Sequence, residues 1–465
     1  MDADSRIQPV LGLPGPRQDR PARPPWRDFG LIHRNFSGSI LSGLTFIHRT
    51  YGPFVRTRLP MHLYFVADPA VIDEILVKKA DAFRKDRTSR LMGRVIGKGL
   101  LVNEGESWRR QRRLMQPAFH QRHLQGYATQ MATAVERAAG AWSPGEVRNV
   151  HDDMMAVTMT IVAEALFGTG VAGNTDRVGH AIAEMMEEFG RILGLAARFQ
   201  PPAWVPTRVN RKLRAAARQI DGLILGIIAE RKKSHAQGDA RRDDLLSLLV
   251  DARDEDGAGM SDTQIRDEAM TLFLAGHETT ALVLTYALHL LAQHPDRQAR
   301  LADEVTRVLG GRRPTYEDLP ALAETELVVL ETMRLYPPAW VIARQALTAV
   351  EVGGFRFPRG AEFVMSPWVV HRDPTLFAEP DTFDPDRWRD DLAKRLPRFA
   401  YFPFGGGPRV CIGNRFAMME AKLVLAGLLQ RFRFEPSPDT HLELRPSVTL
   451  RPRGGLRLRL AARAC

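Results

Sequence analysis

Apolar residues recur at the three- and four-residue spacing of a helix face along most of the chain, so the sequence predicts a mainly α-helical protein. The longest predicted helix begins at the capping-box sequence Ser261-Asp262-Thr263-Gln264 and ends before Pro295. The same pattern predicts further helices at residues 150–167, 178–198, 208–233 and 414–431.

Residues 269–292 of the longest helix are apolar on almost every side, which indicates burial in a large core or in a membrane. The membrane interpretation is excluded because His277, Glu278 and Thr279 place polar groups at its middle. A buried acid needs a partner or a purpose. We therefore expect a core helix that carries chemistry at its centre.

Short extended runs predict a smaller β-rich part. Residues 54–58 and 62–66 predict a hairpin, and residues 351–357 and 361–366 predict further strands of the same sheet. Residues 447–450 predict the tip of a last hairpin. The expected fold class is mainly α, with a large helical domain and a smaller β-rich lobe.

Other stretches lack a regular pattern. Residues 80–102 show no clear period and predict a long loop, which inside a compact domain is usually functional. A proline-rich break at 200–206 separates two helices and predicts a helix-loop-helix. Residues 1–28 are polar and rich in proline, and we expect residues 29–465 to form a single domain.

Composition narrows the class of protein. The 65 basic residues exceed the 54 acidic residues by 11, which first suggests a nucleic-acid partner. Aromatic residues do not interleave with the basic ones and no nucleic-acid module is recognisable, so we expect no nucleic acid. The two cysteines, Cys411 and Cys465, cannot build a disulfide framework, which predicts a reducing, cytoplasmic location.

Cys411 lies in a glycine-rich loop just before a predicted helix. Gly405, Gly406 and Gly407 permit the loop to approach a bulky planar group closely. The positive end of the following helix favours a thiolate over a thiol. Such a thiolate suits haem iron, whereas the alternative is an inert buried cysteine beside a turn.

The order of residues around the cysteine resembles the haem-binding signature of the cytochrome P450 family. Its fixed positions are Phe404, Gly407, Arg409, Cys411 and Gly413. The resemblance extends from about residue 13 to the end of the chain and implies the cytochrome P450 fold. Membrane-bound members carry an apolar anchor before a proline-rich hinge, so the absence of such a run in residues 1–28 implies a soluble bacterial form with no membrane anchor.

Three further motifs occur in the order that the family shows. Trp108 and Arg112 lie four residues apart and match an element that contacts a haem propionate. Glu331, Arg334 and Arg387 match a structural triad that holds the thiolate loop. The helix segment matched to the iron-facing part of the family contains Ala275, Gly276, Glu278 and Thr279.

The resemblance implies roles for these residues. Gly276 would leave room for dioxygen, and Thr279 would donate to its distal oxygen. Glu278 would deliver protons, a general-acid role suited to a carboxyl in an apolar setting. Arg344 would reach a propionate. The substrate pocket would be lined by Leu101, Phe273, Trp340, Val341 and Val448.

The implied protein is a haem-thiolate monooxygenase with haem b, which inserts one oxygen atom from O₂ into a lipophilic substrate. Fatty acids, terpenoids, steroids and macrocycles all remain open as substrates. The chain has no dinucleotide fingerprint and no iron–sulfur cysteine cluster, so electrons would come from a ferredoxin or flavodoxin with its NAD(P)H reductase. Such an acidic partner would be attracted by Arg109, Arg110, Arg398, Arg415 and Lys422.

Two other functions remain open at this point. A haem-thiolate enzyme of the same fold can use peroxide or rearrange oxygenated lipids without dioxygen, although such enzymes often lack the acid and alcohol pair present here. A non-enzymatic haem sensor or binding protein would need no electron donor.

Overall fold

The computed structural model describes residues 21–57, 62–168, 205–237 and 244–463. The chain divides into two compact units, each assembled from separate segments. The first, here called the sheet unit, comprises Met1–Arg84, Trp340–Phe383 and Asp390–Val410. The second, here called the helical unit, comprises Lys85–Ala339, Asp384–Arg389 and Cys411–Cys465.

A five-stranded sheet organises the sheet unit, in the order β1-β2-β8-β5-β3. Its strands are β1 (Phe54–Arg56), β2 (Leu63–Val66), β3 (Phe83–Lys85), β5 (Ile342–Ala346) and β8 (Glu362–Met365). The antiparallel pair β1–β2 confirms the predicted hairpin, and β8 runs parallel to β2. The two strands β6 (Val350–Val352) and β7 (Phe355–Phe357) form a separate hairpin. The prediction that this segment joins the five-stranded sheet is therefore wrong.

Aromatic side chains hold this hairpin to the sheet. The ring centroid of Tyr64 lies 4.7 Å from that of Phe357 and 5.4 Å from that of Phe363. Such contacts bury much apolar area at favourable ring geometry. Among the described residues, the α-helices of this unit are α1 (Phe29–Gly38), α2 (Ile40–Tyr51), α3 (Pro69–Asp73), α14 (Pro367–Val370) and α15 (Leu392–Arg395).

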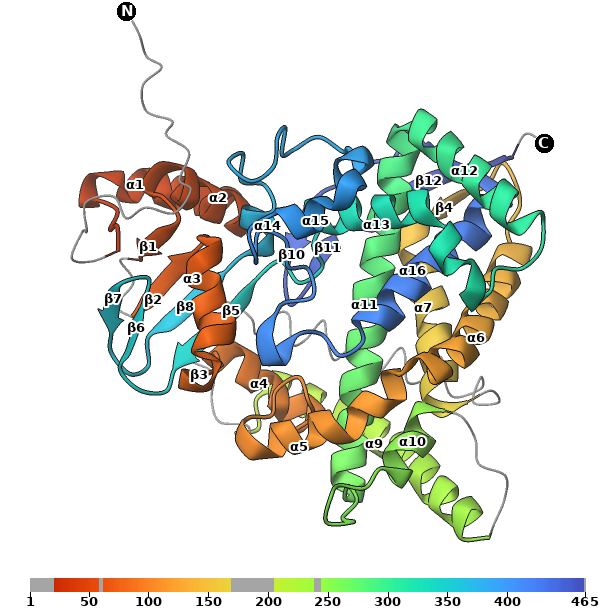
Figure 1. The fold of residues 1–465 in the computed structure, drawn as a ribbon, viewed down its shortest axis with the longest axis horizontal. Helices are drawn as coiled ribbons and strands as arrows, with labels where there is room; N and C mark the ends of the chain where they lie inside the picture. Colours follow the sequence, from red (N-terminus) through yellow and green to blue (C-terminus); the bar gives the residue numbers. More distant parts are fainter. Residues whose placement is uncertain (1–20, 58–61, 169–204, 238–243, 464–465) are drawn as a thin grey trace, which may run out of the picture. The chain divides into compact units, whose positions relative to one another are not determined.

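The helical unit contains most of the α-helices of the described ranges, the longest of them included (Figure 1). They are α4 (Arg87–Ile96), α5 (Gly105–Met115), α6 (Gln121–Gly140), α7 (Val150–Phe167), α9 (Arg208–Ala236), α10 (Leu245–Asp251), α11 (Asp262–Gln293), α12 (Pro295–Leu309), α13 (Ala323–Leu335) and α16 (Asn414–Leu429). Its short strands are β4 (Val147–Asn149), β9 (Phe432–Pro436), β10 (Leu444–Pro446), β11 (Leu450–Pro452) and β12 (Arg457–Ala462). The fold is therefore mainly α with a smaller β part, as predicted.

Helix α11 forms the core of the helical unit, where it packs against α7, α9, α13 and α16 (Figure 1). The predicted capping box is present, because the Ser261 side chain accepts from the Gln264 backbone and the Gln264 side chain accepts from the Ser261 backbone. No helix within the described ranges is both long and apolar enough to cross a membrane. The strong apolar character of α11 thus serves the core, as predicted.

Residues 80–102 differ from the predicted loop, because they contain β3 and the ten-residue helix α4. Asp86 begins α4 by accepting hydrogen bonds from the backbone N–H groups of Thr88 and Ser89. The many arginines in this helix conceal its apolar period in the sequence. The predicted helix at 178–198, most of the proline-rich break after it and residues 1–20 lie outside the described residues.

Candidate functional site

Cys411 lies in the turn that leads into α16, with an exposed side chain that forms no disulfide within the described part of the chain. Desolvation by the surrounding protein raises the pKa of its thiol, while the N–H of Gly413 and the charge of Arg112 oppose that rise. A thiol in this setting ionises most readily when a metal cation binds it. An accessible, unpaired sulfur with a backbone N–H donor fits a thiolate ligand of haem iron.

The glycines before the cysteine are explained by close packing within the sheet unit. Gly407 has φ +67°, and a Cβ there would lie 1.9 Å from the carbonyl oxygen of Leu76. A Cβ on Gly406 would lie 2.1 Å from the ring of Phe399. Phe404 and Arg409 are half-buried in the same loop. The loop therefore excludes side chains at these positions whether or not a planar group lies on its other side.

Trp108 and Arg112 lie on one face of α5, as their spacing predicts. The Arg112 guanidinium carbon is 6.0 Å from the centroid of the Trp108 ring. Trp108 is buried and Arg112 is half-buried. Desolvation lowers the pKa of Arg112, while the charge of Cys411 counteracts it. An indole beside a guanidinium fork can orient a carboxylate such as a haem propionate.

Helix α11 is buried from Ile265 to Ala292 except at four residues, here called the accessible stripe: Leu272, Ala275, Gly276 and Thr279. Their spacing of three, one and three residues places them on one helix face. The Thr279 hydroxyl donates to the Ala275 carbonyl at 2.7 Å. An accessible line in the middle of an otherwise buried helix is where a ligand can meet this core.

Gly276 has a second explanation besides space for dioxygen. A Cβ at this position would lie 2.9 Å from Cγ2 of Val162 on α7. The lack of a side chain is thus required by the close approach of α11 and α7. Phe273, predicted to line the pocket, is instead fully buried against Phe167 of α7, with ring centroids 6.2 Å apart.

Glu278 is ion-paired and not in the apolar setting that we expected. Its Oε1 lies 2.5 Å from Nε of Arg451, and it also accepts a short hydrogen bond from the Thr449 hydroxyl. Burial opposes ionisation, but these two partners outweigh it and lower the pKa of Glu278. The resting group is a carboxylate, so it can accept and pass a proton but does not store one.

The sequence did not predict that Arg451 and Thr449, which lie about the tip of the β10–β11 hairpin, would bind Glu278. The hairpin itself was predicted, but its contact with α11 joins residues 173 apart in the chain. The neighbouring His277 is buried, and its two ring nitrogens have no hydrogen-bond partner among the described residues. Burial lowers the pKa of His277 to about 4, so the ring is neutral at pH 7.

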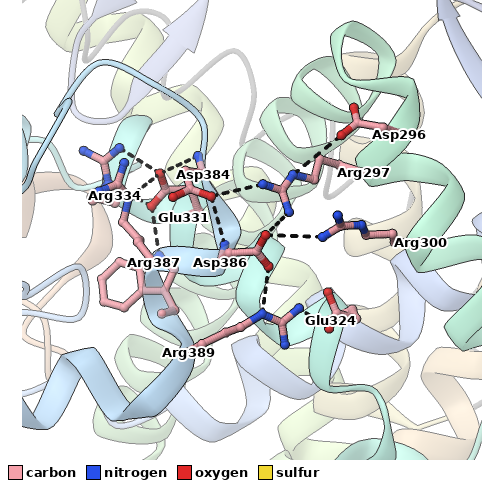
Figure 2. A network of polar contacts seen from close by, with 11 residues as sticks. Asp296, Arg297, Arg300, Glu324, Glu331, Arg334, Asp384, Asp386, Arg387 and Arg389 are labelled. Atoms are coloured by element: carbon pink, nitrogen blue, oxygen red, sulfur yellow. Dashed lines mark hydrogen bonds and ion pairs between the residues drawn. The ribbon is translucent and has the colours of Figure 1, made fainter.

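The structure brings Glu331, Arg334 and Arg387 together at the centre of a buried polar network (Figure 2). Arg334 donates to both carboxylate oxygens of Glu331 at 2.8 Å, and Arg387 Nε donates to Oε1 at 2.9 Å. Trp388 Nε1 and the backbone N–H of Asp384 donate to the same carboxylate at 2.9 and 3.0 Å. Glu331 and Arg334 are completely buried. These bonds tie the segment that follows Phe383 to α13.

A second carboxylate extends the network to α12 (Figure 2). Asp386 accepts from Arg297, from Arg300 at 3.3 Å and from Arg389 at 2.8 Å. The hydrogen bond from Arg297 is the largest of the effects that lower the pKa of Asp386 to about 2. Sequence reasoning missed this layer, because single arginines on a helix are most often solvated.

The other predicted residues are distributed between the two units. Leu101 and Val448 are half-buried in the helical unit, and Val341 is half-buried in the sheet unit. Trp340 is buried, and its carbonyl accepts from the Ser366 hydroxyl at 2.7 Å. Arg344 is buried on β5, where one guanidinium N–H donates to the Ala343 carbonyl at 2.9 Å.

Comparisons with known proteins agree with the resemblance seen in the sequence. A family model described as "Cytochrome P450" matches residues 21–458. The chain is 40% identical over 407 residues to cyclooctatin synthase of Streptomyces melanosporofaciens, which covers 86% of this chain and 87% of that protein. It is 35% identical over 416 residues to pentalenene oxygenase of Streptomyces avermitilis, which covers 89% and 91% of the two chains.

A solved structure is similar over nearly the same length. The haem domain of cytochrome P450DA superposes with a TM-score of 0.85 at 28% sequence identity. The match covers 96% of this chain and 98% of that chain.

Proposed function

This chain belongs to the cytochrome P450 family and is a monooxygenase, and we propose that it inserts one oxygen atom from dioxygen into a terpenoid. Cyclooctatin and pentalenene, for which two relatives are named, are both terpenoids. The accessible side chains Leu272, Ala275 and Val448 are apolar, which suits a hydrocarbon skeleton. The apolar character of these side chains supports a lipophilic substrate, and the compounds for which the relatives are named favour a terpenoid among the lipophilic classes.

Haem is the cofactor of the family, and we propose haem b with Cys411 as its axial ligand. Trp108 and Arg112 would hold a propionate, since indole and guanidinium N–H groups suit carboxylates. When bound, haem supplies the electron transfer and the dioxygen chemistry, while the protein orients and insulates it. Gly413 N–H and the positive end of α16 stabilise the Cys411 thiolate.

Proton handling falls to Thr279 and Glu278. The Thr279 hydroxyl lies on the accessible stripe and donates its own proton to the Ala275 carbonyl, so in this arrangement it does not donate to dioxygen as expected. Its lone pairs can instead accept a hydrogen bond from a bound water. Glu278 is next to it in the chain and is ionised, so it accepts a proton from water at a carboxylate oxygen and returns it. Arg451 and Thr449 hold that carboxylate in position.

The electron donor in this proposal is a ferredoxin or flavodoxin with its NAD(P)H reductase. Among the cations expected to attract it, Arg415 is exposed, whereas Lys422 is buried and pairs with Glu326 at 2.7 Å. Lys422 is therefore not part of the proposed docking surface. Residues 29–465 would act as one domain, and the lack of a disulfide framework supports a cytoplasmic location.

The carbon monoxide difference spectrum of the reduced protein tests the cofactor, with Cys411→Ser as the variant and Cys465→Ser as its control. Wild type and Cys465→Ser should show the band diagnostic of thiolate ligation, and Cys411→Ser should not. Turnover of a terpene panel with NADPH and surrogate redox proteins tests the reaction. Product formed with peroxide alone, and none with NADPH, would instead support the peroxide-using enzyme.

A further inference from the structure

The accessible stripe continues beneath a loop at its N-terminal end. Residues 268, 272, 275 and 279 recur at intervals of four, three and four, so Glu268 lies on the same face of α11 as Thr279, one turn before Leu272. Unlike those residues, Glu268 has no accessible surface. With a rise of about 1.5 Å per residue, the backbone of Glu268 lies roughly 10 Å along the helix from Ala275.

The loop over Glu268 comprises residues 97–101. The backbone N–H of Leu100 donates to Glu268 Oε2 at 2.8 Å, and the N–H of Lys98 donates to Asp267 Oδ2 at 2.7 Å. A Cβ on Gly99 would lie 2.1 Å from the hydroxyl oxygen of Thr271. Two adjacent carboxyl groups and a close glycine contact therefore hold this loop on α11.

Two oxygen atoms under the loop are left without partners. Glu268 Oε1 and Thr271 Oγ1 are both buried, and neither has a hydrogen-bond partner within the described ranges. The hydrogen bonds that hold the loop on α11 do not involve these two atoms, because the Leu100 N–H binds only Oε2 of Glu268. Buried polar atoms in native structures are nearly always satisfied by protein, by water or by a ligand.

The protonation of Glu268 specifies what it can bind. Desolvation raises the pKa of Glu268 to about 8, with the Leu100 N–H opposing and the charge of Asp267 adding to the rise. The carboxyl is therefore mostly protonated at pH 7, and since Oε2 accepts from Leu100, the proton resides on Oε1 as an unused donor. Arg266, the nearest cation along the helix, pairs with Asp267 and Asp221. The other cation of this region among the described residues is Lys98 of the loop, whose side chain is exposed, so no buried positive charge faces Glu268 to hold a carboxylate. The complementary group is therefore a neutral oxygen.

We propose that Glu268 and Thr271 form a recognition site for a hydroxyl or carbonyl oxygen of the substrate, with Leu272 and Ala275 covering the apolar skeleton between that oxygen and the oxidised carbon. This inference rests on the proposed terpenoid function and refines it. The enzyme then acts on a terpenoid that already carries an oxygen atom remote from the carbon that it oxidises. A hydroxylation, a water-quenched cyclisation or, for a carbonyl, the oxidation of an alcohol must therefore supply its substrate.

Spectral titration of the ferric holoenzyme tests the site with two matched pairs of probes, β-farnesene with farnesol and dodecane with 1-dodecanol. The measured quantity is the ratio of the hydrocarbon Kd to the alcohol Kd. We compare this ratio between variants, because the difference in hydration between the two ligands is the same for every protein and cancels. Glu268→Leu should lower this ratio about tenfold, and Thr271→Val, which keeps the side-chain volume, should lower it severalfold. Glu268→Gln should retain it, because the amide can accept from Leu100 and donate to the ligand.

Asp267→Asn is the matched control, since Asp267 holds the same loop but lies off the stripe. Its ratio should equal that of wild type. A carboxylic acid C=O band that shifts on adding alcohol, and is absent from Glu268→Gln, provides a second readout that does not depend on haem. If Glu268→Leu does not fold, Thr271→Val and the infrared band decide.

The outcomes separate the inference from the proposed function. If the ratio of hydrocarbon Kd to alcohol Kd for the farnesyl pair falls in Glu268→Leu and Thr271→Val, the result supports both the recognition site and the terpenoid function. The same dependence in the dodecyl pair alone supports the recognition site and overturns the terpenoid assignment. Equal ratios in all variants overturn the recognition site and leave the terpenoid function standing, and no spectral shift with either pair overturns both.

Discussion

Glu278 Oε1 lies 2.5 Å from Nε of Arg451, so the acid next to Thr279 in the chain is held as half of an ion pair. Removing Arg451 would leave burial as the main influence on Glu278, and the pKa of Glu278 would rise above its ordinary value. We expect Arg451→Met to retain less activity at pH 6 than at pH 8, relative to wild type. Product formed per NADPH across that range measures the effect.

Arg453→Met is the control for this change, because Arg453 pairs with the half-exposed Glu443 beyond the same hairpin. Its pH profile should match that of wild type. An Arg451→Met profile parallel to wild type would remove the ion pair from proton handling.

Thr279→Ala should separate electron use from product formation. The hydroxyl is the only one on the accessible stripe, so its loss removes the hydrogen-bonding group that would hold a water for proton delivery. Product per NADPH should fall at least about tenfold, with a matching rise in peroxide release. Thr285→Ala removes the same kind of bond, from Thr285 to the Ala281 carbonyl at 2.7 Å, at a buried position off the stripe. Equal coupling in the two variants would contradict the role of Thr279.

Glu331→Gln should disrupt the segment that precedes the cysteine loop. The carboxylate accepts five hydrogen bonds in a fully buried setting, and an amide would leave two arginines uncompensated. We expect a loss of about 3–5 kcal/mol in the free energy of unfolding, together with poor haem retention. Glu326→Gln, at a half-exposed acid whose buried partner Lys422 also donates to the Leu319 carbonyl, should cost less than about 1 kcal/mol. Urea unfolding and the haem content of purified protein measure both.

His277→Phe should make the free energy of unfolding less dependent on pH in mild acid. The folded pKa of His277 is about 4, below the value of about 6.5 in an unfolded chain, so the unfolded state binds the proton more readily. The contribution of the neutral His277 ring to the free energy of unfolding is complete above pH 6.5 and declines as the pH falls towards 4. Between pH 7.5 and 5 the wild type should lose about 2 kcal/mol through this group, and the variant should not. Replacing the exposed His441 with glutamine should leave the wild-type slope.

Gly407→Ala and Gly405→Ala separate backbone strain from close packing. Both glycines have positive φ, near 67° and 69°, but a Cβ at Gly405 would lie 3.6 Å from Ile342, an ordinary contact. Gly405→Ala should therefore cost about 1–2 kcal/mol from φ alone. Gly407→Ala should cost clearly more, because its Cβ would overlap the Leu76 carbonyl. Melting temperatures of the two proteins measure the difference, and equal values would refute the packing explanation.

The sequence predicted the elements whose signals are local. The capping box at Ser261, the apolar core of α11 and the hairpin at 54–66 all follow from spacing, caps and turn chemistry within a few residues. The triad of Glu331, Arg334 and Arg387 required the family resemblance as well, since only Glu331 and Arg334 share a helix. Helix α4 was missed although Asp86 caps it, because basic residues dilute its apolar face.

The contacts that sequence reasoning missed join distant segments. Arg451 reaches Glu278 across 173 residues, and Arg297 reaches Asp386 across 89. No local pattern specifies which of many arginines will meet a buried acid, because that depends on how the hairpin and helices pack. Phe273 was predicted to line the pocket, but its side chain packs against α7. A shift of one residue along a helix rotates a side chain by about 100°, so sequence spacing alone did not decide whether Phe273 faces α7 or the accessible stripe.

The stripe on α11 also bears on engineering. Of its four residues, only Leu272 and Ala275 project side chains without a hydroxyl, so they are the two sites of the stripe at which a product profile can be reshaped without altering the proposed roles of Thr279, Glu268 and Thr271. A saturation library at the pair would be small enough to assay completely, and helix packing elsewhere would stay untouched. Selectivity in this enzyme should accordingly be tunable with little penalty in robustness.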